Sequence, residues 1–431
     1  MDSITVNVAS HTAMLIEAVR EKEDIINQWL NSYEQGNPLP LYSSVDIRDS
    51  GYKMAVVDTN IFPAGFNNLC KHGILDAIKF IRKAILQRIR HGKNIVIIAE
   101  EHTRNMWYLE NVRVLKTIIE KAGFNVKIAT FLSDNHPVCE EKPWKLFTTA
   151  TGYPIKLYYL KWLLMKESHD IDLIILNNDL TSGIPDILKN ADIPIYPSAK
   201  AGWHSRMKSQ HFEYTHKLIY ELAEILKIDP WLLTCLHSSE KDIDINNEID
   251  RTRLMKKASD LLKQIEKKYH QYNIIDKPYI LIKSDSGTYG MGVIPIEEAT
   301  EILKLNRRNR NKLYKGKNSK LIRNFLLQEG IPTIYHIEQQ ASEVCIYQID
   351  NNLIGGFYRS HSMKGSRDNL NSHGMTFKKM CPHSQEYSSC GIRHDVNIFD
   401  IYRILARVAG IAAHWEIKDL ELKSNNTDQE K

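Results

Sequence analysis

Strand and helix patterns alternate along the first half of the chain, and this alternation is the feature that most constrains the fold. Short apolar runs are separated by longer stretches with apolar residues at helical spacing. The expected order is strand 54–58, helix 73–90, strand 94–100, helix 104–122, strand 125–131, helix 155–166 and strand 172–176. This order is typical of a largely parallel sheet with helices on both faces. We therefore predict an α/β protein with a parallel-sheet N-terminal domain.

Polar clusters follow four of the expected strands, at residues 58–60, 100–102, 133–135 and 177–179. Ligands of such sheets gather beyond the carboxyl ends of the strands. The clusters therefore indicate a substrate site, although turn chemistry alone accounts for part of such a pattern.

A glycine-rich stretch, "YILIKSDSGTYGMGVIPI", covers residues 279–296. Its two apolar runs predict a pair of strands joined by a flexible turn. Gly287, Gly290 and Gly292 can adopt positive φ and let backbone N–H groups approach a ligand closely. With the charge of Lys283 beside it, such a loop suits phosphate oxygens. Because a strand follows, it is neither a Walker loop nor a dinucleotide fingerprint, and a plain surface hairpin is the alternative.

The balance of charge argues against nucleic acid as the main partner. The chain has 57 basic and 52 acidic residues, a net charge of +5. The main basic concentration, 307–320, has few aromatic residues and is more typical of a solvated helix face than of an RNA-binding patch. No apolar stretch has the length of a membrane span, and no signal peptide is evident, so we expect a soluble cytoplasmic protein.

The cysteines and histidines show no metal-binding spacing. The six cysteines are scattered without a Cys-x-x-Cys pair, so reduced thiols are expected and a zinc site is not. His361, His373, His383 and His394 also lack a zinc pattern, and surface or supporting roles are expected for them.

The length of 431 residues and the changes of pattern indicate several domains. Further helices are expected at 9–33, 206–227, 252–272, 297–314 and 398–416. The expected division is 1–50, an N-terminal helical segment; 51–200, an α/β substrate-binding domain; 201–278, a helical connection; 279–422, a nucleotide- and metal-binding region; and 423–431, a polar tail.

An α/β domain followed by a lysine, a glycine-rich hairpin and antiparallel strands resembles the ATP-grasp ligases. The resemblance implies an ATP-grasp-like α+β nucleotide-binding region with one ATP-binding lysine before the nucleotide lobe and a second at the start of the glycine-rich loop. It also implies an acidic hinge in "FLLQEGIP" that holds the ribose or adenine region. It implies that Arg359, in "EVCIYQIDNNLIGGFYRSHS", meets the transferred phosphoryl group together with Lys283. The implied ATP-binding residues are Lys208, Lys283, Ser286, Gly287, Tyr289, Gly290, Met291, Gly292 and Glu329.

The segment "GSRDNLNSHG" resembles the metal loop of the same ligases. The resemblance implies that Asp368, Asn369 and Asn371 bind Mg²⁺ held by the nucleotide phosphates. The acidic metal ligand expected before this loop is not obvious, so Asp350 and Glu343 compete with Asp368 for that role.

The stretches "VVDTNIFPAGFNNLC", "AEEHTRNMWYLENV", "SDSGTYGMGV" and "YRSHSMKGSRDNLNSHGM" together resemble the glutamate–cysteine ligases of proteobacterial ATP-grasp type. The resemblance implies ATP-dependent ligation of the glutamate side-chain carboxylate to cysteine through a γ-glutamyl phosphate, the first step of glutathione biosynthesis. An arginine fork suits the α-carboxylate of glutamate and an aspartate its α-ammonium. The substrate-binding candidates are Asp58, Asn60, Asn67 and Arg104.

Two other functions stay open on the sequence alone. One is another ATP-grasp carboxylate–amine ligase, such as a glutathione synthetase. The other is a non-catalytic nucleotide- or RNA-binding protein that uses the basic run. Assembly into a homo-oligomer is also left open.

Overall fold

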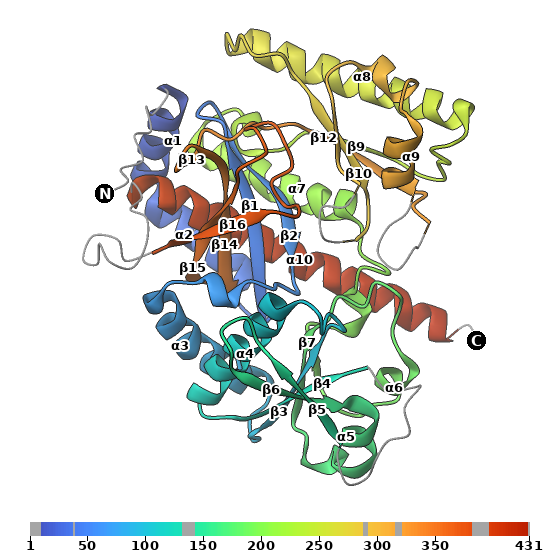
Figure 1. Cartoon of the computed structure of the whole chain (residues 1–431). Coiled ribbons are helices and arrows are strands. Elements are labelled where there is room, and N and C mark those ends of the chain that lie inside the picture. Colours follow the sequence, from blue (N-terminus) through green and yellow to red (C-terminus); the bar gives the residue numbers. More distant parts are fainter. Residues whose placement is uncertain are drawn as a thin grey trace.

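The computed structural model describes residues 10–37, 39–131, 143–287, 292–314, 321–381 and 396–429. Their strands form three sheets, of which one is largely parallel and two are antiparallel. The parallel sheet lies at one end of the molecule and a four-stranded sheet at the other, with the second antiparallel sheet and the long helix α10 (Val396–Gln429) between them (Figure 1). The chain is therefore a mixed α/β protein.

The central antiparallel sheet has the strand order β16-β15-β14-β1-β2, and β13 pairs with β14. On β14, Val344 and Ile346 pack in the core that contains α10, whereas Cys345 and Tyr347 point to the core on the other side. Side chains alternate between the faces of a strand, and both faces here are covered, so β14 is apolar almost throughout. The bounds are β1 Tyr42–Asp49, β2 Met54–Asn60, β13 His336–Ile337, β14 Gln340–Ile349, β15 Asn352–His361 and β16 Met375–Met380.

The parallel sheet has the order β5-β6-β4-β3-β7-β8, with β5 antiparallel at one edge. On β3, Ile95 and Ile97 face the core with α3 and α4, and Val96 and Ile98 face the core with α5 and α6. Helices therefore cover both faces, as predicted. The bounds are β3 Asn94–Ala99, β4 Asn125–Thr130, β5 Trp144–Thr148, β6 Pro154–Tyr159, β7 Leu173–Asn177, β8 Ile195–Tyr196, α3 Lys71–Arg88, α4 Met106–Lys121, α5 Leu160–Lys166 and α6 Asp186–Lys189.

Two predictions for this region are wrong. The first expected strand, 54–58, is part of β2 and pairs with β1 in the central sheet, not with the parallel strands. The expected helix 155–166 is strand β6 followed by the short helix α5. Ile155, Leu157 and Tyr159 are buried in alternation, and this period of two belongs to a strand.

The four-stranded sheet has the order β11-β10-β12-β9 and carries α8 (Glu248–Gln271) on one face (Figure 1). The predicted hairpin is confirmed, since β10 (Ile280–Ser284) pairs antiparallel with β11 (Ile294–Ile296). The expected helix 297–314 is divided into a 3₁₀ turn, Ala299–Ile302, and α9, Arg307–Tyr314. The other strands are β9 His237–Glu240 and β12 Phe325–Glu329.

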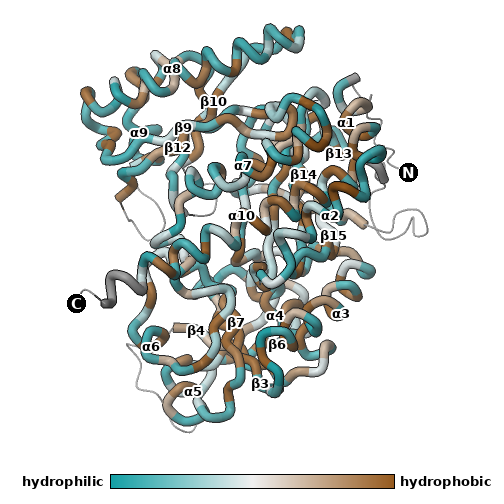
Figure 2. Tube along the Cα trace, turned by 180° about the vertical axis from the view of Figure 1, so that it is seen from behind, coloured by the Kyte–Doolittle hydropathy of each residue, from teal (hydrophilic) through white to brown (hydrophobic). Residues whose placement is uncertain are grey.

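The remaining long helices pack against α10. The expected helix 9–33 is two helices, α1 (Ser10–Glu21) and α2 (Glu23–Glu34), and α7 spans Lys208–Leu226. Hydrophobic residues lie along α10 and the strands, those of the parallel sheet included, while α8 is largely hydrophilic (Figure 2). Among the described helices, none combines the length and apolar character needed to cross a membrane.

Candidate active site

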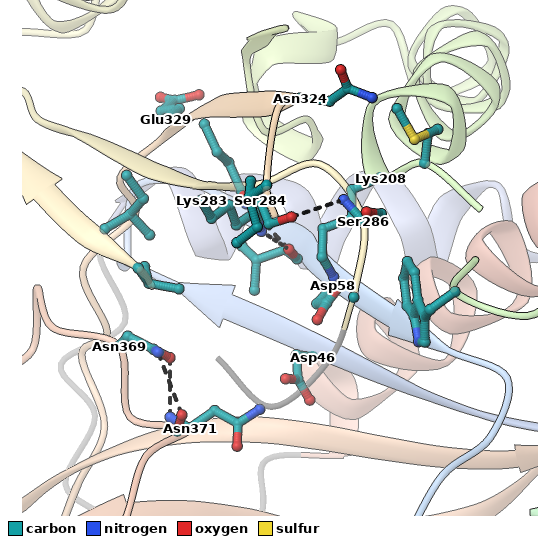
Figure 3. A pocket seen from close by; sticks show the side chains of 18 of the residues that line it. Asp46, Asp58, Lys208, Lys283, Ser284, Ser286, Asn324, Glu329, Asn369 and Asn371 are labelled. Carbon is teal, nitrogen blue, oxygen red and sulfur yellow. Dashed lines mark hydrogen bonds and ion pairs between the residues drawn. The ribbon is translucent and has the colours of Figure 1, made fainter. Parts of the chain in front are cut away.

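A cavity of about 260 Å³ lies between the central sheet and the four-stranded sheet (Figure 3). Strands β10 and β12 contribute from the four-stranded sheet, and β1, β2 and β14 from the central sheet. Charges of both signs line it, among them Asp46, Asp58, Lys208, Lys283 and Glu343. The cavity therefore suits a ligand with several ionised groups.

Asp285 brings the two lysines predicted to bind ATP to the same cavity. It follows β10, the strand that carries Lys283, and its backbone oxygen accepts a hydrogen bond from the Lys208 N–H at 2.7 Å. Its carboxylate accepts hydrogen bonds from Ser209 N–H and Oγ, each at 2.7 Å. The carboxylate thus caps the first turn of α7, where anionic groups are favourable. The N-terminus of α7 is held beside the end of β10.

Lys283 is a buried amine that faces this cavity. Among the described residues, its ammonium donates one hydrogen bond, to the Val57 backbone oxygen at 3.2 Å, and lies 5.7 Å from the centre of the Phe212 ring. Burial lowers the pKa of Lys283 from 10.5 to about 8; the nearby Lys208 also lowers it, and Asp58 opposes the fall. The site therefore holds a cation that is poorly compensated before any ligand binds.

Asp58 bridges the lysines electrostatically. Lys208 Nζ lies 2.6 Å from Asp58 Oδ1 and 4.5 Å from the centre of the Trp203 ring. Burial alone would raise the pKa of the Asp58 carboxyl, but Lys208 and Lys283 outweigh burial and lower the pKa below its usual range. Asp58 is therefore ionised at neutral pH.

Two arginines and two carboxylates form a second charged group across β1, β14 and β15. Arg359 Nη1 lies 2.8 Å from Asp46 Oδ2 and 2.6 Å from Glu343 Oε1, while Arg48 Nε lies 2.6 Å from Glu343 Oε2. Burial alone would raise the pKa of the Glu343 carboxyl, but Arg48 and Arg359 outweigh it and lower the pKa. Asp46, Arg48 and Glu343 line the cavity, and Arg359 lies behind the two carboxylates.

Arg48 also holds the predicted metal loop. It donates hydrogen bonds to the backbone oxygens of Ser366 at 2.9 Å and Asp368 at 2.8 Å. Within the loop, Asn371 N–H donates to Asn369 Oδ1 at 3.1 Å (Figure 3). Asn369 and Asn371 both line the cavity. The loop therefore places two asparagines in the lining of the same cavity as the carboxylates of β1 and β14.

The sequence matches the glutamate-cysteine ligase family model over residues 17–417. The chain belongs to the glutamate-cysteine ligase family. The reaction of this family is the synthesis of γ-glutamylcysteine, and the family is ATP-dependent.

A solved structure agrees with this assignment. A candidate gamma-glutamylcysteine synthetase from Methylobacillus flagellatus KT is 31% identical with a TM-score of 0.85, covering 96% of this chain and 98% of that one. A D-alanyl-alanine synthetase A from Vibrio cholerae O1 biovar eltor is 8% identical with a TM-score of 0.33, covering 74% of this chain and 81% of that one. The last likeness is too slight to support an argument. No curated protein sequence matches the chain.

In this ligase, the predicted hinge residue Glu329 already has partners. Its carboxylate lies 2.8 Å from Lys53 Nζ, and both side chains are fully buried. It also accepts hydrogen bonds from Trp231 Nε1 at 3.1 Å and from Leu236 N–H at 2.9 Å. Glu329 belongs to the cavity lining, but its charge is balanced within the protein.

The glycine-rich loop of the ligase is described only at its two ends. Ser286 and Gly287 line the cavity. Gly292 has φ of 71°, and a Cβ there would lie 2.5 Å from the Lys312 backbone oxygen, so glycine is required for two reasons. Tyr289, Gly290 and Met291 lie outside the described residues, as does the polar cluster 133–135.

The predicted substrate and metal residues are only partly brought together. Asp58 lines the cavity, whereas Asn60, Asn67 and Arg104 are not among its lining residues. Asn60 Oδ1 instead accepts a hydrogen bond from Phe62 N–H at 2.8 Å, which is a turn.

The three acidic residues considered as metal ligands lie in different places. Asp368 Oδ2 accepts a hydrogen bond from Gly365 N–H at 2.8 Å and shapes the loop. Asp350 pairs with Arg88 at 2.7 Å in another hollow of the surface. Glu343 lines the cavity.

Sequence reasoning missed Asp46 and Arg48, which lie in a stretch where no chemistry was expected. The pattern that could have found them is "SSVDIRDS", in which Asp46 and Arg48 alternate with the apolar residues Val45 and Ile47. Residues at this spacing share one face of a strand, so the pair indicates a charged patch on one side of β1.

Proposed function

We propose that this chain ligates glutamate to cysteine in the cavity between the central and four-stranded sheets, by way of a γ-glutamyl phosphate. The observation that carries the proposal is Lys283, a buried cation with a pKa lowered to about 8 that faces a cavity lined by further charges. A buried ammonium without a full counter-ion is costly unless an anion arrives. A nucleotide phosphate would supply that anion.

The two lysines fit ATP. Lys208 and Lys283 line the same cavity as Ser286 and Gly287 of the glycine-rich loop. Phosphoryl transfer depends mainly on positioning and on neutralisation of charge, which lysines and backbone N–H groups provide. A lysine on β10 next to a glycine-rich hairpin supports the assignment of this half to the ATP-grasp type of nucleotide-binding region.

The donor set also fits Mg²⁺, a hard cation that prefers oxygen ligands. Asn369 and Asn371 offer amide oxygens, and Asp46 and Glu343 offer carboxylates, all in the cavity lining. Bound there, Mg²⁺ would neutralise phosphate charge. We assign Asn369 and Asn371 as ligands with Glu343 as the acidic one, and Asp368 as the residue that shapes their loop.

Arg359 would act through its carboxylate partners. It is 2.8 Å from Asp46 and 2.6 Å from Glu343, so it holds both carboxylates at the cavity wall. Asp58 would similarly orient Lys208, from which it is 2.6 Å away. Both contacts keep side chains in place before substrates bind. Such positioning accounts for a large part of the rate acceleration in reactions of this kind.

Isotope transfer tests the proposal. Glutamate labelled with ¹⁸O in its side-chain carboxylate is incubated with ATP, Mg²⁺ and cysteine. One labelled oxygen should appear in the released phosphate, since the acyl phosphate is cleaved between carbon and oxygen. Unlabelled phosphate would refute the acyl-phosphate route. Turnover with γ-glutamylcysteine and glycine, but not with glutamate and cysteine, would instead support a glutathione synthetase.

A further inference from the structure

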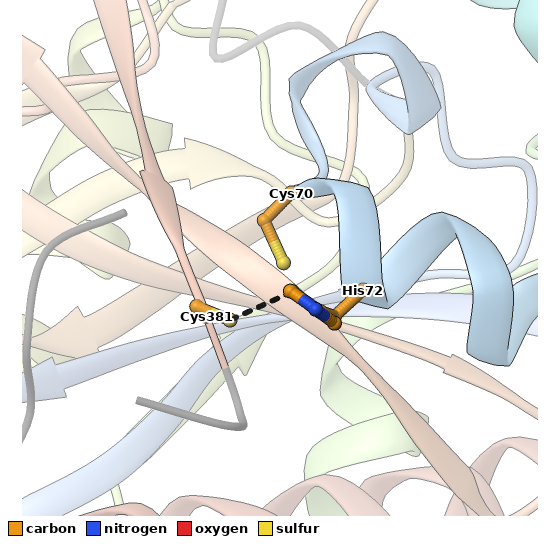
Figure 4. A group of neighbouring side chains, drawn as sticks. All are labelled: Cys70, His72 and Cys381. Carbon is orange, nitrogen blue, oxygen red and sulfur yellow. Dashed lines mark hydrogen bonds between the residues drawn. The ribbon is translucent and has the colours of Figure 1, made fainter. Parts of the chain in front are cut away.

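Three potential metal ligands meet outside the cavity described above. Cys70, His72 and Cys381 place their sulfur and imidazole nitrogen atoms within 4.8 Å of one another (Figure 4). Cys381 Sγ is 3.9 Å from His72 Nδ1. None of the three lines the cavity between the sheets, so this group has no part in the site proposed for ligation.

Two of these residues are held beside strand β15, one by a helix and the other by a neighbouring strand. Cys70 is the N-cap of α3, and its sulfur accepts a hydrogen bond from Gly73 N–H at 3.3 Å. A Cβ at Gly73 would lie 2.3 Å from the Ile354 backbone oxygen, so the start of α3 is packed directly on β15. Cys381 follows β16, which pairs with β15. The two sulfurs are therefore positioned by the same strand.

The donor set is that of a soft or borderline metal ion. Two thiolates and an imidazole are ligands of Zn²⁺, whereas Mg²⁺ prefers oxygen. Zinc bond lengths of about 2.3 Å to sulfur and 2.0 Å to nitrogen imply ligand atoms roughly 3.5 Å apart in a tetrahedron. The observed 3.9 Å between Cys381 Sγ and His72 Nδ1 is close to this spacing, and the 4.8 Å limit for the group leaves a short closing movement.

The burial of the two sulfurs and the exposure of the imidazole also suit a bound metal ion. Cys70 and Cys381 are buried, at 1% and 2% exposure, while His72 is half-buried and opens the group toward solvent. A helix N-terminus favours the thiolate form of a cysteine placed there. The ion can therefore enter past His72 and bind sulfur that is shielded from competing water.

We propose that Cys70 Sγ, His72 Nδ1 and Cys381 Sγ, which meet among the described residues, bind one Zn²⁺ ion. Binding releases the two thiol protons to solvent. The ion links the beginning of α3 to the end of β16. It stabilises the folded protein, because the three ligands are not together in the unfolded chain and the ion therefore binds the folded state more tightly. It takes no part in catalysis.

Cobalt titration tests this site in the full-length protein. The chain is kept reduced, stripped with chelator, and titrated with Co²⁺, whose bonds to thiolates give charge-transfer absorption. We expect one Co²⁺ per chain, displacement by Zn²⁺, and a higher melting temperature with Zn²⁺. Cys70→Ser and Cys381→Ser should each abolish the absorption and the rise in melting temperature. His72→Ala should weaken Co²⁺ binding by at least about tenfold.

Controls separate this site from general thiol binding and from misfolding. Cys235→Ser removes a buried thiol from another core cluster, with Phe212 and Leu326, and should leave the absorption unchanged. Ligase turnover of Cys381→Ser should match that of the parent, which shows that the variant folds. Absorption that survives Cys70→Ser or Cys381→Ser would overturn the proposal. So would a Cys70–Cys381 disulfide, with no bound metal, in freshly purified protein.

Discussion

Replacing Lys283 with methionine should stabilise the nucleotide-free protein and weaken ATP binding. The fall of the Lys283 pKa from 10.5 to about 8 means that the buried, charged amine destabilises the folded protein by about 3 kcal/mol at neutral pH. Methionine fills similar space without charge. Loss of the hydrogen bond from Lys283 to the Val57 backbone oxygen offsets about 1 kcal/mol of this gain in stability. The free energy of unfolding should therefore rise by about 1–2 kcal/mol at pH 7.

The pH dependence follows from the direction of the pKa shift. The folded protein holds the Lys283 proton less tightly than the unfolded chain, so the cost is fully present below pH 8. It declines between pH 8 and pH 10.5, where the folded protein is neutral at this position and the unfolded chain is still charged. The stabilising effect of Lys283→Met should therefore be largest near pH 7 and disappear by about pH 10.5.

Urea unfolding at pH 7 and pH 10, together with calorimetric titration of ATP in the presence of Mg²⁺, measures both effects. Loss of one hydrogen-bonded charge should reduce ATP affinity roughly 10- to 100-fold. Lys208→Met is the matched control, because Lys208 already pairs with Asp58 at 2.6 Å and its removal should not stabilise the protein. Unfolding of Lys283→Met at lower urea than the parent at pH 7, or unchanged ATP affinity, would refute the reasoning.

Three further variants test other contacts. Asn369→Ala should raise the Mg²⁺ concentration needed for half-maximal turnover before it alters the KM for glutamate; identical Mg²⁺ titrations would remove Asn369 from the ligand set. Arg359→Lys should lower kcat at least about tenfold, because one ammonium cannot replace a guanidinium fork between two carboxylates; an unchanged kcat would contradict this. Glu416→Gln breaks a buried pair with Arg206 at 2.7 Å and should cost about 3–5 kcal/mol at pH 7. Burial alone would raise the pKa of Glu416, but Arg206 and His211 together outweigh burial and lower the pKa from 4.5 to about 2. The stability from this ionisation is therefore present above pH 4.5 and lost toward pH 2, and urea unfolding of parent and variant should converge over that range.

Local sequence patterns are enough to predict several parts of the fold. The hairpin of β10 and β11 is predictable because its apolar runs and glycines lie next to one another in the chain. Lys283 is expected from the glycine-rich stretch beside it and Lys208 from the resemblance to the ATP-grasp ligases, and both line the cavity. The hairpin and Lys283 depend on neighbours in sequence and on side-chain chemistry, which the sequence displays directly.

Strand pairing was decided only in the tertiary structure. Residues 54–58 have the pattern of a buried strand, which does not say which sheet the strand joins. In the structure β2 pairs with β1, and β1 pairs with β14, nearly three hundred residues later in the chain. The contacts of Asp46 and Arg48 with Glu343 follow from this pairing and could not be read from the local sequence.

The local sequence also does not show which residue neutralises a buried charge or which side chains together bind a metal ion. The resemblance to the ATP-grasp ligases implies a nucleotide contact for Glu329, but Lys53 lies against its carboxylate through folding of the whole chain. Cys381 shows no metal-binding spacing with Cys70 and His72, because it lies 309 positions after His72 in the sequence. Sequence spacing predicts a site only when its ligands come from one turn, helix or hairpin. When packing of distant strands brings the side chains together, as in both charged groups of the cavity and in the cysteine–histidine group, only the tertiary structure decides which residues meet.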